Sequence, residues 1–466
     1  MKRFLIIIAI VGLIFISSCK KDETETTDTP DTPIHECTHL EWVFPEGTKC
    51  HERAAAEYTC IECGKVFARE ERLKEHEILE EEVAPKCEED GYHREYCKNC
   101  DYESRFRLAA TGHLHGHYEI DLKATATSTG RRHKVCDDCG AVFKSIEYAA
   151  NGFSDHGKLS VNGTDLVDAN GDPFQLVGIS THGLQWFAQY VKYNVIEELR
   201  NEFGINVLRI ALYSAEGGYC DPNTSAERKQ FFYDTVCNGV EIATALDMYC
   251  IVDWHMLGAD DPSDGNPLYY KEEAKAFFTS ITEKYKDYDN VLYEIMNEPC
   301  GDTTWTQCKI YANQIIPIIR ANTDAIVLVG NPHWSADLAS VINSPLEGYE
   351  NIMYTFHFYA NGSSNPEPLR RAHKANIPVF VSEHGAMEST GDGPLDITKL
   401  LGMYSVMEEY NLSYVAWNLS NSKGSASIHK NATSVIDDFS DSNLKEWGIW
   451  YKKWVRKKFG LTVEED

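Results

Sequence analysis

Between positions 152 and 460 the apolar residues fall into short runs, and most stretches between these runs have the periodicity of amphipathic helices. The runs are rich in β-branched and aromatic residues, which is typical of buried strands. Eight strands are predicted, at 173–180, 206–213, 248–255, 291–299, 325–332, 352–359, 378–385 and 413–420. Helices are predicted at 194–203, 229–246, 271–285, 305–321, 368–374 and 395–409, and a final amphipathic one at 444–459.

This alternation predicts an α/β fold, a (β/α)8 TIM barrel over residues 152–460. In such a barrel the active site lies at the carboxyl ends of the strands. Polar and aromatic residues recur at these ends: Tyr213, Asp253, His255, Asn297, Glu298, His357, Tyr359, Glu383, His384, Trp417 and Asn418. Two glutamates, Glu298 and Glu383, follow strands four and seven and indicate the paired carboxylates of a glycoside hydrolase.

The amino terminus has the pattern of an export signal. Lys2 and Arg3 precede an apolar run at 4–16 that is too short to span a bilayer. The following Ser17-Ser18-Cys19 resembles a bacterial lipobox, which implies a signal peptide at 1–18 and lipid attachment at Cys19; the alternative is a plain signal peptide. We therefore expect an exported protein anchored by lipid to a bacterial membrane, and the acidic residues after Cys19 favour the outer cell surface.

Residues 19–36 are acidic and rich in Thr and Pro, so they are predicted to form an extended linker. The region 37–150 contains a repeat. His39, Cys50, Cys60 and Cys63 recur 37 positions later as His76, Cys87, Cys97 and Cys100. A partial third copy has His113 or His115, then Cys136 and Cys139, with Ala126 in place of its first cysteine.

The Cys-x2-Cys pairs resemble zinc-ribbon half-sites, and three thiolates with one imidazole would complete a tetrahedral zinc site. The histidine before or after each pair could be the fourth ligand. A disulfide framework is the alternative, because disulfides are common in exported proteins. The third copy lacks one cysteine, so it is the weakest metal candidate. The repeats are expected to be small modules that present the barrel, with a carbohydrate- or partner-binding module as the alternative.

The charge of the chain argues against one class of partner. The sequence has 72 acidic and 44 basic residues, a formal net charge of -28. Nucleic-acid binding is therefore not expected, since it needs clustered Lys and Arg. The other predicted associations are a membrane, through the lipid anchor, and a polysaccharide substrate, with a monomeric catalytic domain.

Seven runs resemble glycoside hydrolase family 5, and in particular its subfamily 2 cellulases. They are STHGLQW (180–186), NVLRIALY (206–213), IVDWH (251–255), YEIMNEP (293–299), YTFHFY (354–359), PVFVSEHG (378–385) and VAWNLSN (415–421). The resemblance implies a cofactor-independent, retaining endo-β-1,4-glucanase acting on cellulose or mixed-linkage β-glucan. A mannanase or xyloglucanase on the same barrel, or a non-catalytic glycan-binding lipoprotein, is the alternative.

The resemblance also implies residue roles. Glu298 would be the general acid/base and Glu383 the nucleophile, kept ionised by Arg209 and hydrogen-bonded by Tyr359. The carboxyl groups of these two glutamates should lie about 5–5.5 Å apart. Substrate-binding or supporting roles are implied for Asn297, His182, Trp186, Tyr213, His255, Trp334, His357 and Trp417.

The loop after strand eight departs from the family pattern. A lysine usually follows the tryptophan by five residues, whereas here Ser422 has that place and Lys423 is shifted by one. Contacts to a second glucose are therefore in question. Among the remaining cysteines, Cys300 and Cys308 are candidates for a disulfide, and two of Cys220, Cys237 and Cys250 could form another, although the sequence does not indicate which two. Because the candidate catalytic residues all lie in the barrel, removal of 37–150 is expected to leave hydrolysis nearly intact.

Overall fold

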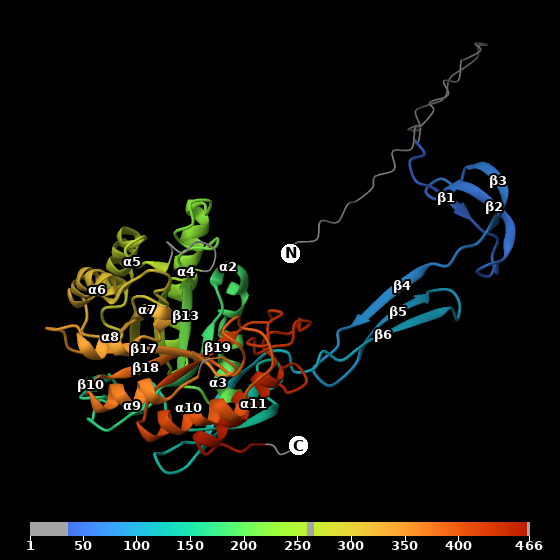
Figure 1. Ribbon diagram of the computed structural model, residues 1–466. Coiled ribbons are helices and arrows are strands. Elements are labelled where there is room, and N and C mark those ends of the chain that lie inside the picture. The colour runs from blue at the N-terminus through green and yellow to red at the C-terminus, as the bar shows by residue number, and fades with distance from the viewer. Residues whose placement is uncertain (1–35, 259–264, 363, 464–466) are drawn as a thin grey trace, which may run out of the picture. The chain divides into compact units, whose positions relative to one another are not determined.

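A computed structural model describes residues 36–258, 265–362 and 364–463 (Figure 1). The predicted signal peptide, Cys19 and most of the linker lie outside these residues. The chain divides into two compact units, one ending at Gly112 and the other beginning at His113. This boundary falls inside the region 37–150, so the third repeat belongs to the same unit as the barrel.

The first unit contains two three-stranded antiparallel sheets, one for each of the first two repeats. Their strands are β1 (Leu40–Val43), β2 (Arg53–Cys60), β3 (Val66–Leu73), β4 (Ile78–Val83), β5 (Gly91–Cys97) and β6 (Glu103–Leu108). In each sheet the first cysteine of the Cys-x2-Cys pair is the last residue of the second strand, and the other cysteine lies in the turn before the third strand. Gly64 follows the first pair with a φ of +73°, a conformation that glycine adopts without strain.

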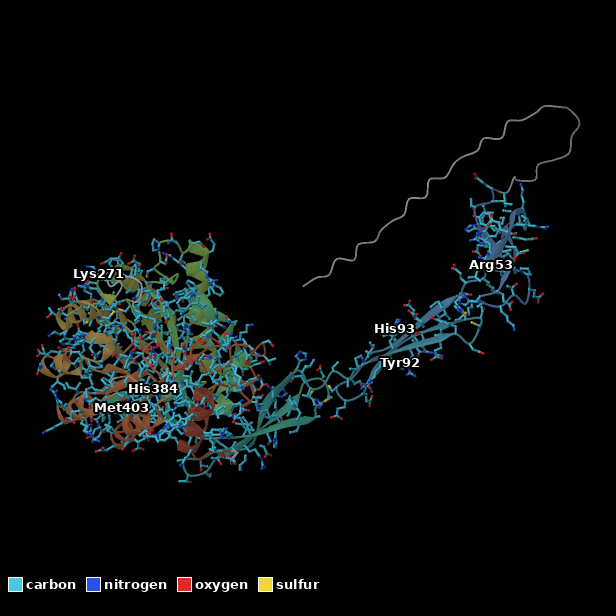
Figure 2. The ribbon with its side chains drawn as sticks, turned by 45° about the vertical axis from the view of Figure 1, so that its right-hand side comes forward. Arg53, Tyr92, His93, Lys271, His384 and Met403 are labelled. Carbon is cyan, nitrogen blue, oxygen red and sulfur yellow. The ribbon has the colours of Figure 1, made fainter. Side chains whose placement is uncertain are left out.

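These sheets have few buried side chains. In β2 Ala56 and Cys60 are fully buried, whereas most residues of β3 are exposed. Figure 2 shows the sticks of Arg53, Tyr92 and His93 on these single-layer sheets. A module this small buries too little apolar surface to be stable from its core alone, so its clustered thiols and imidazoles become the candidate source of stability.

The second unit begins with a third antiparallel sheet, formed by β7 (Gly116–Leu122), β8 (Gly130–Cys136) and β9 (Val142–Tyr148). This sheet packs on the barrel helix α3 (Tyr193–Phe203) through polar contacts. Glu198 on α3 is 7% exposed and accepts hydrogen bonds from Lys134, Lys144 and Tyr118. The third repeat is thus held to the catalytic unit by a nearly buried carboxylate.

Eight parallel strands close into the predicted barrel. They are β12 (Val177–Thr181), β13 (Val207–Tyr213), β14 (Tyr249–His255), β15 (Val291–Glu294), β16 (Val327–Val329), β17 (Ile352–Tyr359), β18 (Val379–Gly385) and β19 (Tyr414–Leu419). All eight strand positions predicted from the sequence are confirmed. The strands are buried along their whole length apart from the last residue of β17, as expected when helices cover the outside of a parallel sheet.

The helices follow the strands around the barrel. The longer ones are α3, α4 (Ala226–Ala245), α5 (Lys271–Lys284), α6 (Trp305–Arg320), α9 (Glu367–Lys374), α10 (Ile397–Glu409) and α11 (Glu446–Lys458). Shorter ones are α1 (Phe153–His156), α2 (Leu184–Phe187), η1 (Ala188–Tyr190), α7 (Pro332–Ser335) and α8 (Leu338–Asn343). The main hydrophobic core lies between these helices and the outer faces of the strands.

A short hairpin, β10 (Ser160–Asn162) and β11 (Asp165–Val167), precedes the barrel. Its Leu159 and Leu166 pack with Phe174, Val207 and Ile251 in a second apolar cluster drawn from the early part of the strands. This cluster fills the amino-terminal end of the barrel. The opposite, carboxyl-terminal end is left for polar residues.

Three predicted strands were too long. The first was predicted from 173, but β12 begins at Val177. The prediction for strand four ran to position 299, but β15 ends at Glu294, and the prediction for strand five ran to 332, where Pro332 instead begins α7. Proline lacks an amide hydrogen and is favoured at a helix start, so Pro332 belongs to α7, and β16 has already ended at Val329. In the part of the chain that the structure describes, no helix combines the length and apolar character needed to cross a bilayer.

Candidate active site and cysteine clusters

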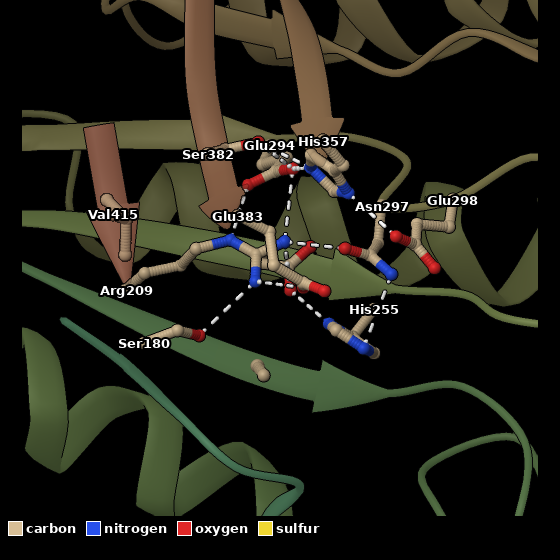
Figure 3. A network of polar contacts seen from close by, with 12 residues as sticks. Ser180, Arg209, His255, Glu294, Asn297, Glu298, His357, Ser382, Glu383 and Val415 are labelled. Atoms are coloured by element: carbon tan, nitrogen blue, oxygen red, sulfur yellow. Dashed lines mark hydrogen bonds and ion pairs between the residues drawn. The ribbon is translucent and has the colours of Figure 1, made fainter. Parts of the chain in front are cut away.

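Glu298 and Glu383 meet at the carboxyl end of the barrel, as the sequence analysis expected (Figure 3). Glu383 lies near the end of β18. Glu298 lies beyond β15, where its backbone N–H donates to Met256 O at 3.2 Å. Both side chains are buried, and a carboxylate oxygen of Glu298 lies within 4.8 Å of one of Glu383. This separation fits the gap of about 5–5.5 Å in retaining enzymes better than the roughly 6.5–9.5 Å of inverting enzymes.

Arg209 on β13 lies fully buried beneath this pair. Its guanidinium contacts Glu383 at 3.3 Å and Asp253 at 3.0 Å, and it forms a two-point ion pair with Glu294 at 2.7 and 3.1 Å. It also donates to Asn297 Oδ1 at 2.7 Å. A planar guanidinium offers five donors in a fixed arrangement, which explains how one side chain fixes all these groups.

Asn297 is oriented from both ends of its amide. Its Oδ1 accepts from Arg209, and its Nδ2 donates to Met256 O and lies 3.3 Å from His255 Nε2. Burial lowers the pKa of His255 well below its usual range, so the ring is neutral. Its Nδ1 lies 2.7 Å from Asp253, which places the ring proton there and leaves Nε2 to accept from Asn297.

His357 connects Glu298, the candidate acid/base, to the buried carboxylate of Glu294. Its Nδ1 lies 2.9 Å from Glu298 Oε1 and its Nε2 lies 2.9 Å from Ser382 Oγ, which in turn donates to Glu294. Burial lowers the pKa of His357, but its hydrogen bonds to Glu294 and Glu298 raise it overall to about 9. A protonated ring donates from both nitrogens, so it holds Glu298 in a fixed position.

The protonation of Glu383 differs from the expectation. Burial and then the charge of Glu298 raise the pKa of Glu383 to about 7. Arg209 lowers it, as expected, and so do His357 and the hydroxyl of Tyr359, which donates at 2.7 Å, but these effects are outweighed. Arg209 therefore acts on the pKa of Glu383 in the expected direction, but burial and the charge of Glu298 decide the net shift. Because the charge of Glu298 is one of the raising causes, Glu383 ionises more readily when Glu298 carries a proton.

The aromatic candidates lie around this centre. Trp417 is 7% exposed and its ring stacks on His255 at 5.2 Å, while Tyr213 stacks on the same ring at 4.1 Å. Trp186 is 46% exposed and packs edge-on against Tyr213 at 5.3 Å. The ring of His182 lies 5.2 Å from Trp417, and burial lowers the pKa of His182 to about 4.

Two further candidates lie on loops. Trp334 is 51% exposed, and its backbone N–H donates to Pro299 O at 3.0 Å, next to Glu298. Lys423 is exposed on the loop after β19. The backbone carbonyls of this loop are bound by Lys445 Nζ, which donates to the oxygens of Ser422, Lys423 and Gly424 at 2.6–3.0 Å.

No role was predicted from the sequence for Glu294 or Asp253. The predicted strand 291–299 contained both Glu294 and Glu298, but β15 ends at Glu294, and the carboxylate of Glu294 is fully buried against Arg209. Burial raises the pKa of Glu294, but the charge of Arg209 outweighs this and the pKa falls to about 2. The sequence did contain an indication of this ion pair, because an acidic residue inside a strand that is buried on both faces needs a buried cationic partner.

The cysteines and histidines of the repeats cluster, but not repeat by repeat. Cys50 of the first repeat joins His76, Cys97 and Cys100 of the second, with one ligand atom of each residue within 4.8 Å of the others. If each repeat formed its own cluster, Cys87 would take the place of Cys50 in this group. For this group the structure selects the histidine that precedes the Cys-x2-Cys pair, which the sequence left open.

The first Cys-x2-Cys pair has another partner. Cys60 and Cys63 group with Cys37, which the sequence analysis did not single out, and the Cys37 and Cys63 sulfurs lie 3.5 Å apart. His39, which was expected in this site, instead forms an ion pair with Glu62 at 2.7 Å. In the second unit, His113 Nδ1 lies 3.5 Å from Cys139 Sγ, beside Cys136.

The cysteines of the barrel are buried. Cys300 and Cys308, the candidates for a disulfide, are not bonded to each other, and in the described part of the chain none of the barrel cysteines forms a disulfide. Cys300 packs against Gly258 and Gly265 next to the loop that carries Glu298.

Comparison with known proteins places this barrel in a family. The family model described as cellulase (glycosyl hydrolase family 5) matches residues 167–423, more than half of the chain. Endoglucanase A of Butyrivibrio fibrisolvens is 44% identical over 300 residues, which cover 63% of this chain and 68% of the relative. An endoglucanase of Clostridium saccharobutylicum is 40% identical over 301 residues, covering 64% of each protein.

Solved structures agree with this assignment. The catalytic domain of Thermobifida fusca endoglucanase Cel5A matches with a TM-score of 0.61 and 34% identity, covering 65% of this chain and 99% of that one. A variant of the same domain in complex with cellotetraose matches with a TM-score of 0.61 and 33% identity, again covering 65% and 99%. The chain therefore belongs to the cellulase family, glycosyl hydrolase family 5.

Proposed function

We propose that the protein is a retaining endo-β-1,4-glucanase that hydrolyses internal bonds of cellulose or mixed-linkage β-glucan. The observation that carries this proposal is the close pairing of Glu298 and Glu383 at the barrel mouth, each held by a different cationic partner. The endoglucanase relatives and the cellotetraose complex of a structural neighbour support a β-1,4-glucan as the substrate.

In the first step Glu383 attacks the anomeric carbon while Glu298 donates its proton to the leaving oxygen. In the second step Glu298 removes a proton from water, which attacks the same carbon and releases Glu383. Arg209 and Tyr359 hold the nucleophile in position, and His357 holds Glu298. Asn297, whose amide is fixed by Arg209 and His255, is placed to bind the sugar 2-hydroxyl. These groups carry out the reaction without a cofactor.

The remaining residues form the proposed glucan-binding surface. Trp186 and Trp334 expose their indole rings, which suit stacking against the apolar faces of sugars. Trp417, Tyr213, His182 and His255 form the aromatic wall beside the catalytic pair. Lys423, shifted by one position from the lysine of the family pattern, is proposed to contact a second glucose, and its exposed position is compatible with this role.

Substrate choice is tested by measuring reducing ends released from carboxymethylcellulose, barley β-glucan, mannan, xyloglucan and xylan. The proposal expects turnover on the first two. Preferential release from mannan or xyloglucan would establish the alternative specificity, and binding without release on every substrate would establish a non-catalytic glycan-binding protein.

The roles of the two glutamates are tested with an activated aryl glycoside. Glu298→Ala should slow hydrolysis of natural substrates by about 10²–10⁴-fold, the usual contribution of general acid–base catalysis. It should still be glycosylated by a dinitrophenyl cellobioside, and azide should restore turnover as the β-glycosyl azide. Glu383→Ala should be inactive on both substrates. Formation of an α-azide by Glu383→Ala would reverse the two roles, and an α-anomer as first product would exclude a retaining mechanism.

We also propose that the protein is exported and anchored by lipid at Cys19, with the catalytic unit acting as a monomer at the cell surface. The support is the pattern of basic, apolar and small residues before Cys19. Cys19→Ser should move the folded protein from the membrane fraction to the soluble fraction. Its retention with membranes, measured by fractionation and immunoblotting, would contradict lipid anchoring.

The cysteine-rich repeats are proposed to bind structural zinc and to present the catalytic unit, not to take part in catalysis. Each cluster combines thiols with, in two cases, an imidazole, the ligand types that zinc prefers. Zinc removal by a chelator should leave hydrolysis of soluble glucan nearly unchanged.

A further inference from the structure

The cluster of Cys50, His76, Cys97 and Cys100 draws its ligands from two neighbouring repeats. Cys50 lies in the loop between β1 and β2 of the first sheet. His76 lies just before β4, and Cys97 and Cys100 lie at the turn between β5 and β6, all in the second repeat. A metal ion bound by these four residues would therefore be shared by two modules.

The distances in this cluster match zinc coordination. Cys50 Sγ lies 3.6 Å from Cys97 Sγ, and Cys100 Sγ lies 3.3 Å from His76 Nδ1. Tetrahedral bonds of about 2.3 Å to sulfur and about 2.0 Å to nitrogen would place two sulfurs roughly 3.8 Å apart and a sulfur and nitrogen roughly 3.5 Å apart. A disulfide would need two sulfurs at about 2.05 Å. The arrangement therefore fits a metal ion and not a bridge between Cys50 and Cys97.

Neighbouring residues also contact the four candidate ligands. The backbone N–H of Asn99 points at Cys97 Sγ at 3.4 Å, and it would stabilise a thiolate there. Tyr102 stacks on the ring of His76 with centroids 4.4 Å apart, and His51, next to Cys50, contacts that ring edge-on at 4.4 Å. Such outer contacts fix the orientation of metal ligands.

We propose that one zinc ion bound by Cys50, His76, Cys97 and Cys100 fastens the first repeat to the second. Between the two sheets the chain itself provides only the short connector 74–77, because β3 ends at Leu73 and β4 begins at Ile78. The ion adds a second connection, so its release frees the two modules to move about the connector. This inference rests on the proposal that the repeats bind zinc.

The sharing of the site is tested by zinc content per full-length chain. Cys50→Ser and Cys97→Ser should each remove about one ion, and the double variant should lose no more than either single variant, because both residues serve one site. Cys50→Ser combined with Cys60→Ser should lose at least as much as the two single losses added together. The opposite result would show that the inference is wrong. If the zinc losses of Cys50→Ser and Cys97→Ser add up in their double variant, and those of Cys50→Ser and Cys60→Ser do not, the site lies within one repeat.

The mechanical role is tested with a glutamate-specific protease, since Glu75 and Glu77 in the connector are exposed. Chelation or Cys50→Ser should increase cleavage at the connector at least several-fold, whereas the matched Cys60→Ser variant should leave it nearly unchanged. Unchanged cleavage in zinc-depleted protein would overturn the fastening. Absence of zinc from the wild-type chain would overturn the zinc proposal, and turnover on carboxymethylcellulose, measured in parallel, reports separately on the glucanase proposal.

Discussion

The buried guanidinium of Arg209 organises the candidate active site residue by residue. Burial disfavours its charge, but the neighbouring carboxylates, Asp253 and Glu294 above all, raise the pKa of Arg209, so it remains cationic. It pairs with Glu294 through two bonds and contacts the candidate nucleophile Glu383 and the amide of Asn297. A charge in this position is stable only while its partners remain, because isolated buried charges are costly.

Glu294→Gln should therefore be strongly destabilising although Glu294 does not reach substrate. Loss of the closest anion leaves Arg209 undercompensated, at a cost of about 3 kcal/mol in the free energy of unfolding. Urea denaturation followed by tryptophan fluorescence measures this cost. The matched change Glu273→Gln, at an exposed position on α5, should shift the transition little. Equal effects of both changes would show that the ion pair with Arg209 does not stabilise the barrel.

The raised pKa of Glu383 predicts a specific pH dependence. A carboxylate with a pKa of about 7 is progressively protonated, and loses nucleophilicity, as the pH falls through 7. Glu298→Gln removes one cause of the raised pKa of Glu383, the neighbouring negative charge. The acid limb of the pH–rate profile should therefore move to lower pH. The rate of covalent trapping by a dinitrophenyl 2-fluoro-cellobioside reports on Glu383 without needing an acid catalyst. An unchanged limb, or one moved to higher pH, would contradict the coupling of the two glutamates.

At the scale of elements, the contact between the third sheet and α3 decides where the catalytic unit begins. Lys144 bridges Glu198 and Glu202 on α3, and Arg132 on β8 donates to Asn201 one turn away from Glu198. At the end of the chain, the N–H of Thr462 donates to Glu147 on β9. The sheet is thus fixed to the barrel by polar contacts at two places.

Glu198→Ala tests this contact. The change leaves Lys134, Lys144 and Tyr118 without their shared acceptor, and hydrogen bonds to charged groups typically contribute about 1.5–3 kcal/mol each. Thermal unfolding should therefore begin at a clearly lower temperature. Glu283→Ala is the matched control, because Glu283 pairs with Lys286 at an exposed position on the barrel surface, where such pairs are worth about 0–1 kcal/mol. Similar shifts in both variants would mean that the sheet does not depend on Glu198.

At the scale of the whole molecule, the compact unit that contains the barrel begins at His113, whereas the barrel itself was predicted to begin at 152. A chain that begins at His113 should keep full activity on soluble glucan and the stability of the parent. A chain that begins at 152 loses the partners of Glu198 and should unfold at lower temperature, although its catalytic residues are intact. Calorimetry and a reducing-sugar assay on both truncated proteins check this, and equal stability of the two would place the boundary where the sequence analysis put it.

Much of the fold and the catalytic pair could be predicted from the sequence. Strands such as 352–359 are recognisable because a strand covered by helices is apolar along its whole length, and the rim residues stand out because charges interrupt these apolar runs at their carboxyl ends. Glu298 and Glu383 were identified for this reason and by resemblance to a family. The ends of β15 at Glu294 and of β16 at Val329 were not identified, because the residues that follow each strand remain mostly apolar although the chain has left the sheet.

The sequence by itself determined which residue types recur and in which order: the eight strands, the two glutamates and the Cys-x2-Cys repeats. Only the tertiary structure decided which of them meet. Glu294 gained its role from Arg209, 85 positions earlier, the pKa of Glu383 depends on burial and on Glu298, and Cys50 joined the second repeat instead of its own. Local patterns follow from the period of each element, whereas contacts and electrostatic shifts depend on distances in space that the order of residues does not contain.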